Sequence, residues 1–333
     1  MSLNVNKRKS FTNTIWVFVL LRGFQSHRKM STITYKEALE LLQARWRIVN
    51  VEQRLKSDRK NLVDEIITCI HEYIPFQSIS FLSKSREERN IMLTNEQIKE
   101  ACFAGEGGLC YVIACFCWML FGALGFSVRL ISSTVTFTTF FKDNHSVVLI
   151  DGLEYENDIH LVDCGLGLPT FRAISLNFSD ESPVFNDGFL EYKYIRHDGN
   201  LRMHGKGDIY KRNGPPVEGL DFIIDHWRRF YFFDLNRKYE NVLQPVQVAC
   251  KIVASGCTHF TSTPVANCFP NKRAVMMMKN MLMMENEKGE LVTTILANDE
   301  EIVQAYNKYF PFINEEKMKR ALEEWHRVSV DSN

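Results

Sequence analysis

The chain is predicted to fold as an α+β protein in which helices come first and antiparallel strands follow. Apolar residues recur at helical spacing over residues 35–74, and a nearly continuous apolar segment covers residues 109–124. From Ser127 the hydrophobic period changes to two, and beyond Pro245 strand-like and helix-like segments are mixed. The 333 residues are enough for two or three packed units.

Two helices in the first part of the chain have clear boundary signals. Thr94 and Gln97 have the spacing of a capping box, which predicts a short helix that continues to Phe103. The segment 109–124 is apolar on all sides, as is typical of a buried helix. Gly125 follows it at the position where a glycine commonly ends a helix.

The middle of the chain is predicted to form a small antiparallel barrel or curled sheet. Turn signals at Asp151-Gly152, Asp198-Gly199 and Gly205-Lys206-Gly207 separate short strand-like segments. The predicted strands are residues 127–137, 145–150, 160–165 and 191–197. The aromatic segment 222–233 is expected in the core, as a strand or a short helix.

The last part of the chain is predicted to combine strands with two helices. Residues 274–284 and 290–297 have strand character, and the consecutive methionines are interpreted as strand core rather than as a metal or cofactor site. Asn298 is a helix-capping residue before a helical pattern, and a charged helix is expected over residues 315–328.

The composition favours an ordinary globular protein and gives no reason to expect nucleic-acid or membrane partners. The 40 basic and 40 acidic residues cancel. The nine cysteines are irregularly spaced and include no CxxC pair, so neither a zinc site nor a disulfide framework is supported. Buried free thiols in a reducing compartment are expected, which favours a cytoplasmic location.

The first thirty residues differ from the rest because they carry basic residues and no acid, the first acid being Glu37. Their apolar run, residues 15–21, is too short to span a bilayer, and no small-residue cleavage site follows it. Residues 1–33 are therefore expected to be a basic extension, disordered or used for targeting. A mitochondrial-type or a secretory signal is an alternative.

Cys110 is the candidate nucleophile. It stands at the predicted start of the buried helix, where the unpaired backbone N–H groups and the helix dipole stabilise a thiolate. A nucleophilic cysteine also needs a base and a group that orients the base. His145 and Asp163 lie on two successive predicted strands and supply both. Considered by itself, however, Cys110 is better explained as a buried structural thiol, and only the order of the three residues makes a nucleophile an equal alternative.

The order of several motifs resembles the arylamine N-acetyltransferase family over residues 34–313. The family's RGGxCxExN motif resembles residues 106–114, and its IPFEN element resembles residues 74–78. Further matches follow in the family's order: the histidine strand HSVVLI at 145–150, VDCGLG at 162–167 in place of VDxGFG, and STP at 262–264.

The resemblance implies three units with a Cys-His-Asp triad between them. A helical bundle, residues 34–125, carries the cysteine, and a central antiparallel β-barrel, residues 126–240, carries the histidine and the aspartate. An α/β lid with a C-terminal helix occupies residues 241–333. The implied co-substrate is acetyl-CoA, no metal is expected, and the oligomeric state is left open.

The resemblance also implies a double-displacement reaction. Cys110 attacks acetyl-CoA and becomes acetylated, and an arylamine, hydrazine or related amine then takes the acetyl group. In this scheme His145 shuttles protons and Asp163 holds its imidazole.

Five further positions are assigned by matching the family's segments. Phe141 and Lys142 are expected near the CoA arm, where the Lys142 ammonium suits a phosphate. Leu166, Leu168 and Phe171 are expected to border the acceptor pocket.

The chain departs from the family's pattern around the cysteine. Glu106 replaces the arginine before the two glycines, and Gln77 and Ser78 replace glutamate and asparagine. Val112 and Ala114 replace polar residues on the cysteine helix. A carboxylate near Cys110 opposes thiolate formation, so the sequence predicts altered reactivity and a gain in acetyl transfer in Glu106→Arg.

Two other functions remain open from the sequence. One is a cysteine hydrolase or a transglutaminase-like enzyme, which has the same Cys-His-Asp order. The other is a catalytically impaired relative that keeps the fold as a binding module, because the residues around Cys110 have changed.

Overall fold

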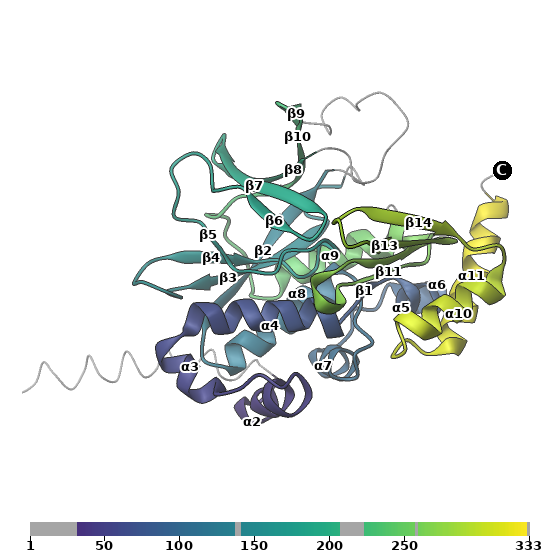
Figure 1. The fold of residues 1–333 in the computed structure, drawn as a ribbon, viewed down its shortest axis with the longest axis horizontal. Helices are drawn as coiled ribbons and strands as arrows, with labels where there is room; N and C mark the ends of the chain where they lie inside the picture. The colour runs from purple at the N-terminus through teal and green to yellow at the C-terminus, as the bar shows by residue number, and fades with distance from the viewer. Residues whose placement is uncertain (1–31, 137–140, 207–222, 257–258, 332–333) are drawn as a thin grey trace, which may run out of the picture.

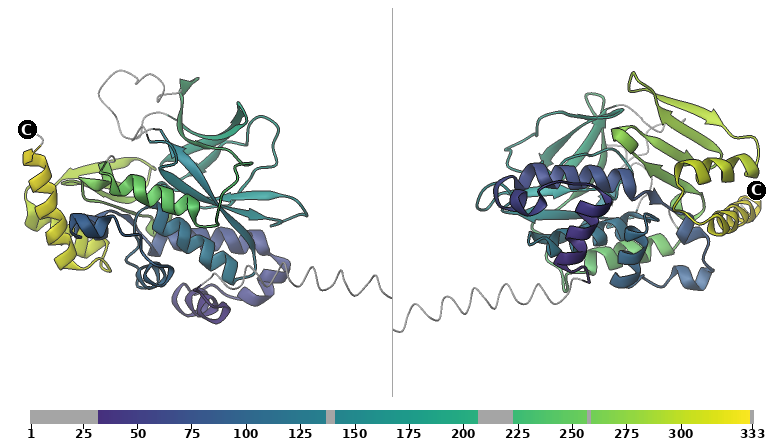
Figure 2. Two further views of the ribbon diagram at one scale, coloured as in Figure 1. Left: turned by 180° about the vertical axis from the view of Figure 1, so that it is seen from behind. Right: turned by 60° about the horizontal axis from the view of Figure 1, so that its bottom comes forward.

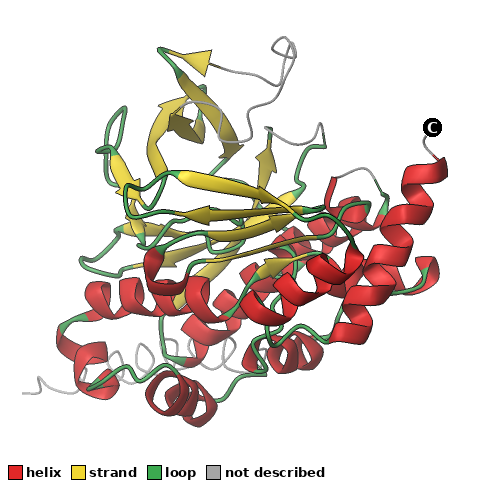
Figure 3. Ribbon diagram, turned by 45° about the vertical axis from the view of Figure 1, so that its right-hand side comes forward, coloured by secondary structure: helices red, strands yellow, loops and turns green. Residues whose placement is uncertain are grey.

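The computed structural model describes residues 32–136, 141–206, 223–256 and 259–331. Helices pack along one side of two antiparallel sheets, and the C-terminal helices lie at one end (Figures 1 and 3). In these ranges no helix is both long and apolar enough to cross a membrane. The expected targeting segment lies outside the described residues, so its alternatives remain predictions.

The first helices bear out the helical patterns in the sequence. Thr94 forms the predicted capping box with Gln97, and Gly125, at φ +88°, follows the last residues of α8 as expected. Every side chain of α8 up to Phe121 is buried. The elements are α2 (Tyr35–Glu40), η1 (Leu41–Arg45), α3 (Val51–Ser57), α4 (Arg59–Tyr73), α5 (Ile79–Leu82), α6 (Arg86–Arg89), α7 (Asn95–Phe103) and α8 (Cys110–Ala123).

The middle of the chain forms an open, curled antiparallel sheet. This is one of the two forms that the strand pattern predicts, and it differs from the complete barrel that the family resemblance implies. Its strand order is β5-β4-β3-β2-β10-β8-β7-β6, with β9 paired to β10, and among the described residues the end strands β5 and β6 do not pair. The strands are β2 (Ser127–Val135), β3 (His145–Asp151), β4 (Ile159–Val162), β5 (Ile174–Ser175), β6 (Phe185–Asp187), β7 (Leu190–His197), β8 (Asn200–Lys206), β9 (Ile223–Ile224) and β10 (Trp227–Phe233).

Large side chains fill the concave side of this sheet. The buried aromatic residues Tyr192, Tyr194, Phe230, Tyr231 and Phe233 belong to one cluster with aliphatic residues of β2, β3 and β4. The aromatic segment whose form was left open in the sequence is therefore a core strand, β10.

A second, five-stranded antiparallel sheet follows, in the order β1-β11-β12-β13-β14. Its edge strand β1 (Phe76–Gln77) comes from the helical part of the chain, so this five-stranded sheet includes a strand from the helical part. The consecutive methionines lie in β12 and β13, as expected. The remaining elements are α9 (Gln244–Ala254), η2 (His259–Thr261), β11 (Val265–Cys268), η3 (Pro270–Lys272), β12 (Val275–Met278), β13 (Met281–Glu285), β14 (Leu291–Ile295), α10 (Asp299–Tyr309) and α11 (Glu315–Asp331).

One hydrophobic core joins the helices to both sheets. Helix α9 packs beside α8 against β2 and β3, although it follows the predicted domain boundary at residue 240 (Figure 2). Val246 and Val253 of α9 share this core with α8 and with Met277 of the five-stranded sheet. The division into three units remains a prediction, but this shared core ties them together.

The turn predicted at Gly205-Lys206-Gly207 is wrong for its first two residues, because β8 continues through Gly205 to Lys206. Gly207 lies outside the described residues. Gly205 pairs with Tyr192 on one side and with Arg228 on the other. A Cβ at this position would lie 2.1 Å from the ring of Phe230. The glycine therefore makes room for an aromatic ring inside the sheet instead of marking a turn.

Gly205→Ala is expected to destabilise the fold. The added methyl group overlaps the Phe230 ring, and overpacking of this kind costs about 1–3 kcal/mol of unfolding free energy. Denaturant unfolding measures the difference. The matched control is Gly122→Ala in α8, where a Cβ would meet Val128 at an ordinary 3.5 Å and no loss is expected. Equal stability of the two variants would contradict the packing role of Gly205.

Candidate active site

Cys110 is the first residue of α8, and a rigid loop places it there. Gly107 has φ +72°, and a Cβ on it would lie 2.0 Å from the carbonyl oxygen of Pro75, so only glycine fits. The amide of Gly108 donates to the same Pro75 oxygen at 3.2 Å, and Gly108 bridges to Phe76 of β1. The Cys110 side chain is buried, and its sulfur lies 3.8 Å from the carbonyl oxygen of Asn144.

Strand register brings His145 and Asp163 together. Val148 of β3 is opposite Val162 of β4, so Asp163 and His145 extend from neighbouring positions on the concave side of the sheet. The His145 Nε2 atom lies 3.1 and 3.0 Å from the two carboxylate oxygens of Asp163. Both side chains are almost completely buried, each at 2% exposure.

Gly165 allows the nucleophile loop to approach this pair. A Cβ on Gly165 would lie 3.0 Å from the carbonyl oxygen of Cys110 and 3.2 Å from its Cα, closer than ordinary contacts. The helix start therefore packs directly against the backbone just after Asp163. Because His145 Nε2 faces the carboxylate, Nδ1 is the ring nitrogen left for the Cys110 thiol. The structure thus brings the three predicted side chains together.

The environment of His145 favours its protonated form. Burial by itself lowers the pKa of a histidine, but the Asp163 carboxylate and its hydrogen bond outweigh this effect, and a hydrogen bond with Cys110 adds to them. The pKa of His145 is consequently raised above its ordinary value. An imidazolium beside a thiol stabilises the thiolate, which is the charge distribution that a nucleophilic cysteine needs.

Tyr231 is a site residue that the sequence analysis did not single out. Its ring centroid lies 5.7 Å from that of His145, and its hydroxyl is 3.1 Å from the hydroxyl of Tyr194. The hydroxyl also interacts with Asp163, and burial raises the pKa of Tyr231 well above its ordinary value. Tyr231 therefore stays protonated and can donate to the carboxylate. The only sequence signal was the high aromatic content of the segment 222–233, which predicts a place in the core.

The predicted cofactor residues lie beside the site. Phe141 and Lys142 form the exposed turn that leads into β3. Asn144 fixes the end of this turn, because its side chain accepts from the amide of Val135 at 2.8 Å and donates to the Val135 carbonyl oxygen at 3.1 Å.

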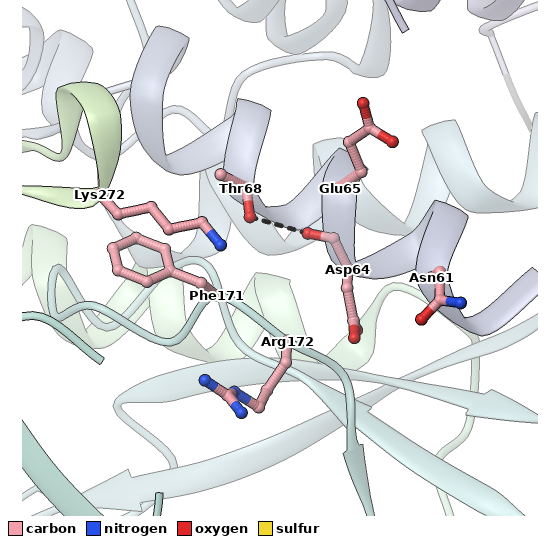
Figure 4. A pocket seen from close by; sticks show the side chains of 7 residues that line it. All are labelled: Asn61, Asp64, Glu65, Thr68, Phe171, Arg172 and Lys272. Atoms are coloured by element: carbon pink, nitrogen blue, oxygen red, sulfur yellow. Dashed lines mark hydrogen bonds between the residues drawn. The ribbon is translucent and has the colours of Figure 1, made fainter. Parts of the chain in front are cut away.

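The three predicted acceptor residues fall into two groups. Leu166 and Leu168 are buried in the cluster on the concave side of the large sheet. Phe171 belongs to a different cluster with Phe269. Its outer side borders a cavity of about 410 Å³, where the Lys272 ammonium lies over the ring (Figure 4).

The changed motif residues form a connected network behind Cys110. The Gln77 side-chain amide donates to Ser80 Oγ at 2.7 Å and to the backbone oxygen of Glu106 at 3.3 Å. The Glu106 carboxylate accepts from the Ser80 hydroxyl and forms an ion pair with Lys317 of α11. Ser78 links β1 to the segment before β11, because its hydroxyl donates to the Thr263 carbonyl oxygen at 2.9 Å.

One group of possible metal ligands occurs within the described ranges, away from Cys110. It consists of Glu154, Asp158 and His160. The two ring nitrogens of His160 face different carboxylates, Glu154 at 3.0 Å and Asp158 at 3.6 Å. Asp158 also accepts three backbone N–H groups. These contacts account for the cluster as a structural turn, and the expected absence of a metal remains a prediction.

Comparison with known proteins identifies the family. A family model described as N-acetyltransferase matches residues 61–317. The fold is similar to that of Mycobacterium marinum arylamine N-acetyltransferase in complex with CoA, with a TM-score of 0.63 and 15% identity over 85% of this chain and 98% of that one. The Nocardia farcinica enzyme gives 0.62 and 18% over 84% and 97%, and the Salmonella typhimurium enzyme 0.61 and 16% over 86% and 98%. No curated protein matches in sequence.

The family model covers well over half of the chain, and the solved structures show the same fold along nearly their whole length. The convergence of cysteine, histidine and aspartate on that fold is consistent with the match. The chain belongs to the arylamine N-acetyltransferase family, a family of acyltransferases.

Proposed function

We propose that the protein transfers the acetyl group of acetyl-CoA to arylamines, hydrazines or related amines through an acetylated Cys110. The observation that carries this proposal is the buried arrangement of Cys110 at a helix start beside the hydrogen-bonded pair of His145 and Asp163. The complex of the Mycobacterium marinum relative with CoA supports acetyl-CoA as the donor.

In the first half-reaction His145 takes the proton of the Cys110 thiol, and the thiolate attacks the carbonyl carbon of the thioester. The bond to the CoA sulfur breaks, and the departing thiolate recovers a proton from the imidazolium. The first backbone N–H groups of α8 are unpaired within the helix, so they can stabilise the oxyanion that forms. Asp163 keeps its charge and holds the ring throughout.

In the second half-reaction the amine attacks the acetylated Cys110. His145 removes a proton from the amine nitrogen, the carbon–sulfur bond breaks, and the Cys110 thiolate is restored. We assign Leu166 and Leu168 to the apolar wall that the amine contacts, since they belong to the same buried cluster as Tyr231. Phe141 and Lys142 are assigned to the CoA arm because they form the exposed turn next to Asn144.

Cys110→Ala is expected to abolish acetyl transfer, because no other residue can carry the acetyl group. Intact-mass measurement after mixing with acetyl-CoA should show one added acetyl group on the wild type and none on the variant. Cys250→Ala is the matched control, since Cys250 is a buried cysteine that interacts with Tyr111. In this variant Cys110 should still be acetylated.

Other results would point to other functions. Release of CoA without a stable adduct and without any amine would support a cysteine hydrolase. A Cys110 thiol that is no more reactive toward iodoacetamide than a model thiol would support a binding module.

The ion pair of Glu106 changes what its substitution should do. The Glu106 carboxylate is partly buried and directed at Lys317 and Ser80, so its charge is compensated from α11. The prediction that Glu106→Arg raises activity assumed an uncompensated carboxylate. In the structure an arginine at this position would face the Lys317 ammonium.

Glu106→Arg is therefore expected to lower the unfolding free energy, by about 1 kcal/mol because the pair is partly exposed to solvent. The rate of Cys110 alkylation should not increase. The charge-swapped pair Glu106→Lys with Lys317→Glu should recover the lost stability, which denaturant unfolding of the single and double variants measures. Faster alkylation in Glu106→Arg would restore the view that Glu106 suppresses the thiolate.

A further inference from the structure

His71 is a buried histidine at the point where the helices, the large sheet and the lid meet. It lies on α4 and is 3% exposed. Its ring is edge-on to the rings of Phe171 and Phe269, with centroids 5.5 and 5.4 Å away. Its backbone oxygen accepts from the amide of Phe269 at 2.9 Å. One residue of α4 therefore contacts both the loop that contains Phe171 and the segment that contains Phe269.

The hydrogen bonds of His71 lead to Asp163 through Thr170. The Thr170 hydroxyl donates to the backbone oxygen of Asp163 at 2.7 Å, so its proton is already used. The His71 Nε2 atom lies 3.2 Å from the Thr170 carbonyl oxygen and 3.3 Å from the Thr170 hydroxyl oxygen. Because both of these atoms are acceptors toward it, Nε2 must carry the proton. The resulting chain runs from His71 to Thr170 to Asp163.

His71 is expected to be neutral, which suits a residue that only donates a hydrogen bond to Thr170. Burial lowers the pKa of His71 to about 4, while Asp163, the bond to Thr170 and Asp187 oppose this only in part. His71 is therefore neutral near pH 7. A neutral ring holds the backbone of Asp163 without competing with His145 for the carboxylate charge.

We infer that His71 is a positioning residue for the proposed catalytic site: it holds Thr170 and thereby the backbone of Asp163 and the loop formed by residues 165–172. The inference rests on the proposed function. His71 touches none of the reacting atoms. Two other groups brace the same loop, since Asn267 of β11 donates to the Gly167 carbonyl oxygen at 3.0 Å and Asp187 of β6 accepts from the amide of Phe171 at 3.2 Å.

The test compares His71→Leu with His71→Gln. Leucine fills a similar volume without a donor, whereas the amide of glutamine can replace the Nε2–H group. His71→Leu should slow Cys110 alkylation by iodoacetamide on the order of tenfold, by analogy with the loss of an outer hydrogen-bond partner at a metal site, and should shift its pH dependence. His71→Gln should retain most of the wild-type rate and its pH profile.

The matched control is His204→Leu. His204 is equally buried, has a pKa lowered to about 4 by burial, and lies in β8 opposite Lys193 and Arg229. This variant should lose stability without a shift in the pH profile. The inference is overturned if His71→Leu and His204→Leu behave alike, or if glutamine is no better than leucine at position 71.

The alkylation assay separates this inference from the proposed function. If wild-type Cys110 is not acetylated by acetyl-CoA, the proposed function fails, yet the alkylation profiles still report whether His71 positions the Cys110–His145–Asp163 group. If Cys110 is acetylated and the profiles of the variants match that of the wild type, only the inference about His71 fails.

Stability against pH gives an independent prediction. Because the pKa of His71 is lowered in the folded state, its contribution is fully present above the unfolded value near 6.5 and is lost as the pH falls toward 4. The unfolding equilibrium constant should rise up to about tenfold per pH unit for this group. His71→Gln should show a flatter profile in denaturant unfolding from pH 7 to 4.5. An unchanged slope would mean that His71 is not held neutral.

Discussion

The close approach of the α8 start to the backbone after Asp163 is the constraint on which the rest of the site depends. A Cβ on Gly165 would lie 3.0 Å from the Cys110 carbonyl oxygen, and Gly107 must adopt φ +72° against Pro75. These two glycines allow the start of α8, the segment after β4 and the edge strand β1 to pack backbone against backbone. The imidazole of His145 can then hydrogen-bond both the Asp163 carboxylate and the Cys110 thiol.

Much of this arrangement could be predicted from the sequence, because its signals are local. The capping box at Thr94, the glycine after α8 and the change of hydrophobic period at Ser127 all correspond to observed boundaries. The order of Cys110, His145 and Asp163 on a helix and two strands left the choice about even, and the resemblance of the surrounding motifs to a family decided it. Strand register, which a period-two pattern strongly specifies, then places the last two on one side of the sheet.

The features that could not be predicted depend on distant pairings. Gly205 was predicted to be in a turn because glycine is common in turns. The ring of Phe230 on the neighbouring strand explains why a glycine is needed there. Closure of a barrel cannot be read from strand patterns, since it depends on whether the end strands pair. Lys317 compensates Glu106 from the C-terminal helix, and no local motif connects the two. The charge of a motif residue therefore has to be judged with its partner in space.

Two buried histidines flank Asp163, and their pKa values move in opposite directions for a physical reason. His145 bonds directly to the carboxylate oxygens, so attraction to the negative charge exceeds the cost of burying an imidazolium. His71 reaches only the backbone of Asp163 through Thr170, so burial between aromatic rings dominates and the ring stays neutral. One carboxylate can therefore serve a proton-carrying histidine and still be held in place by another. The separation requires that Thr170 stand between His71 and the charge.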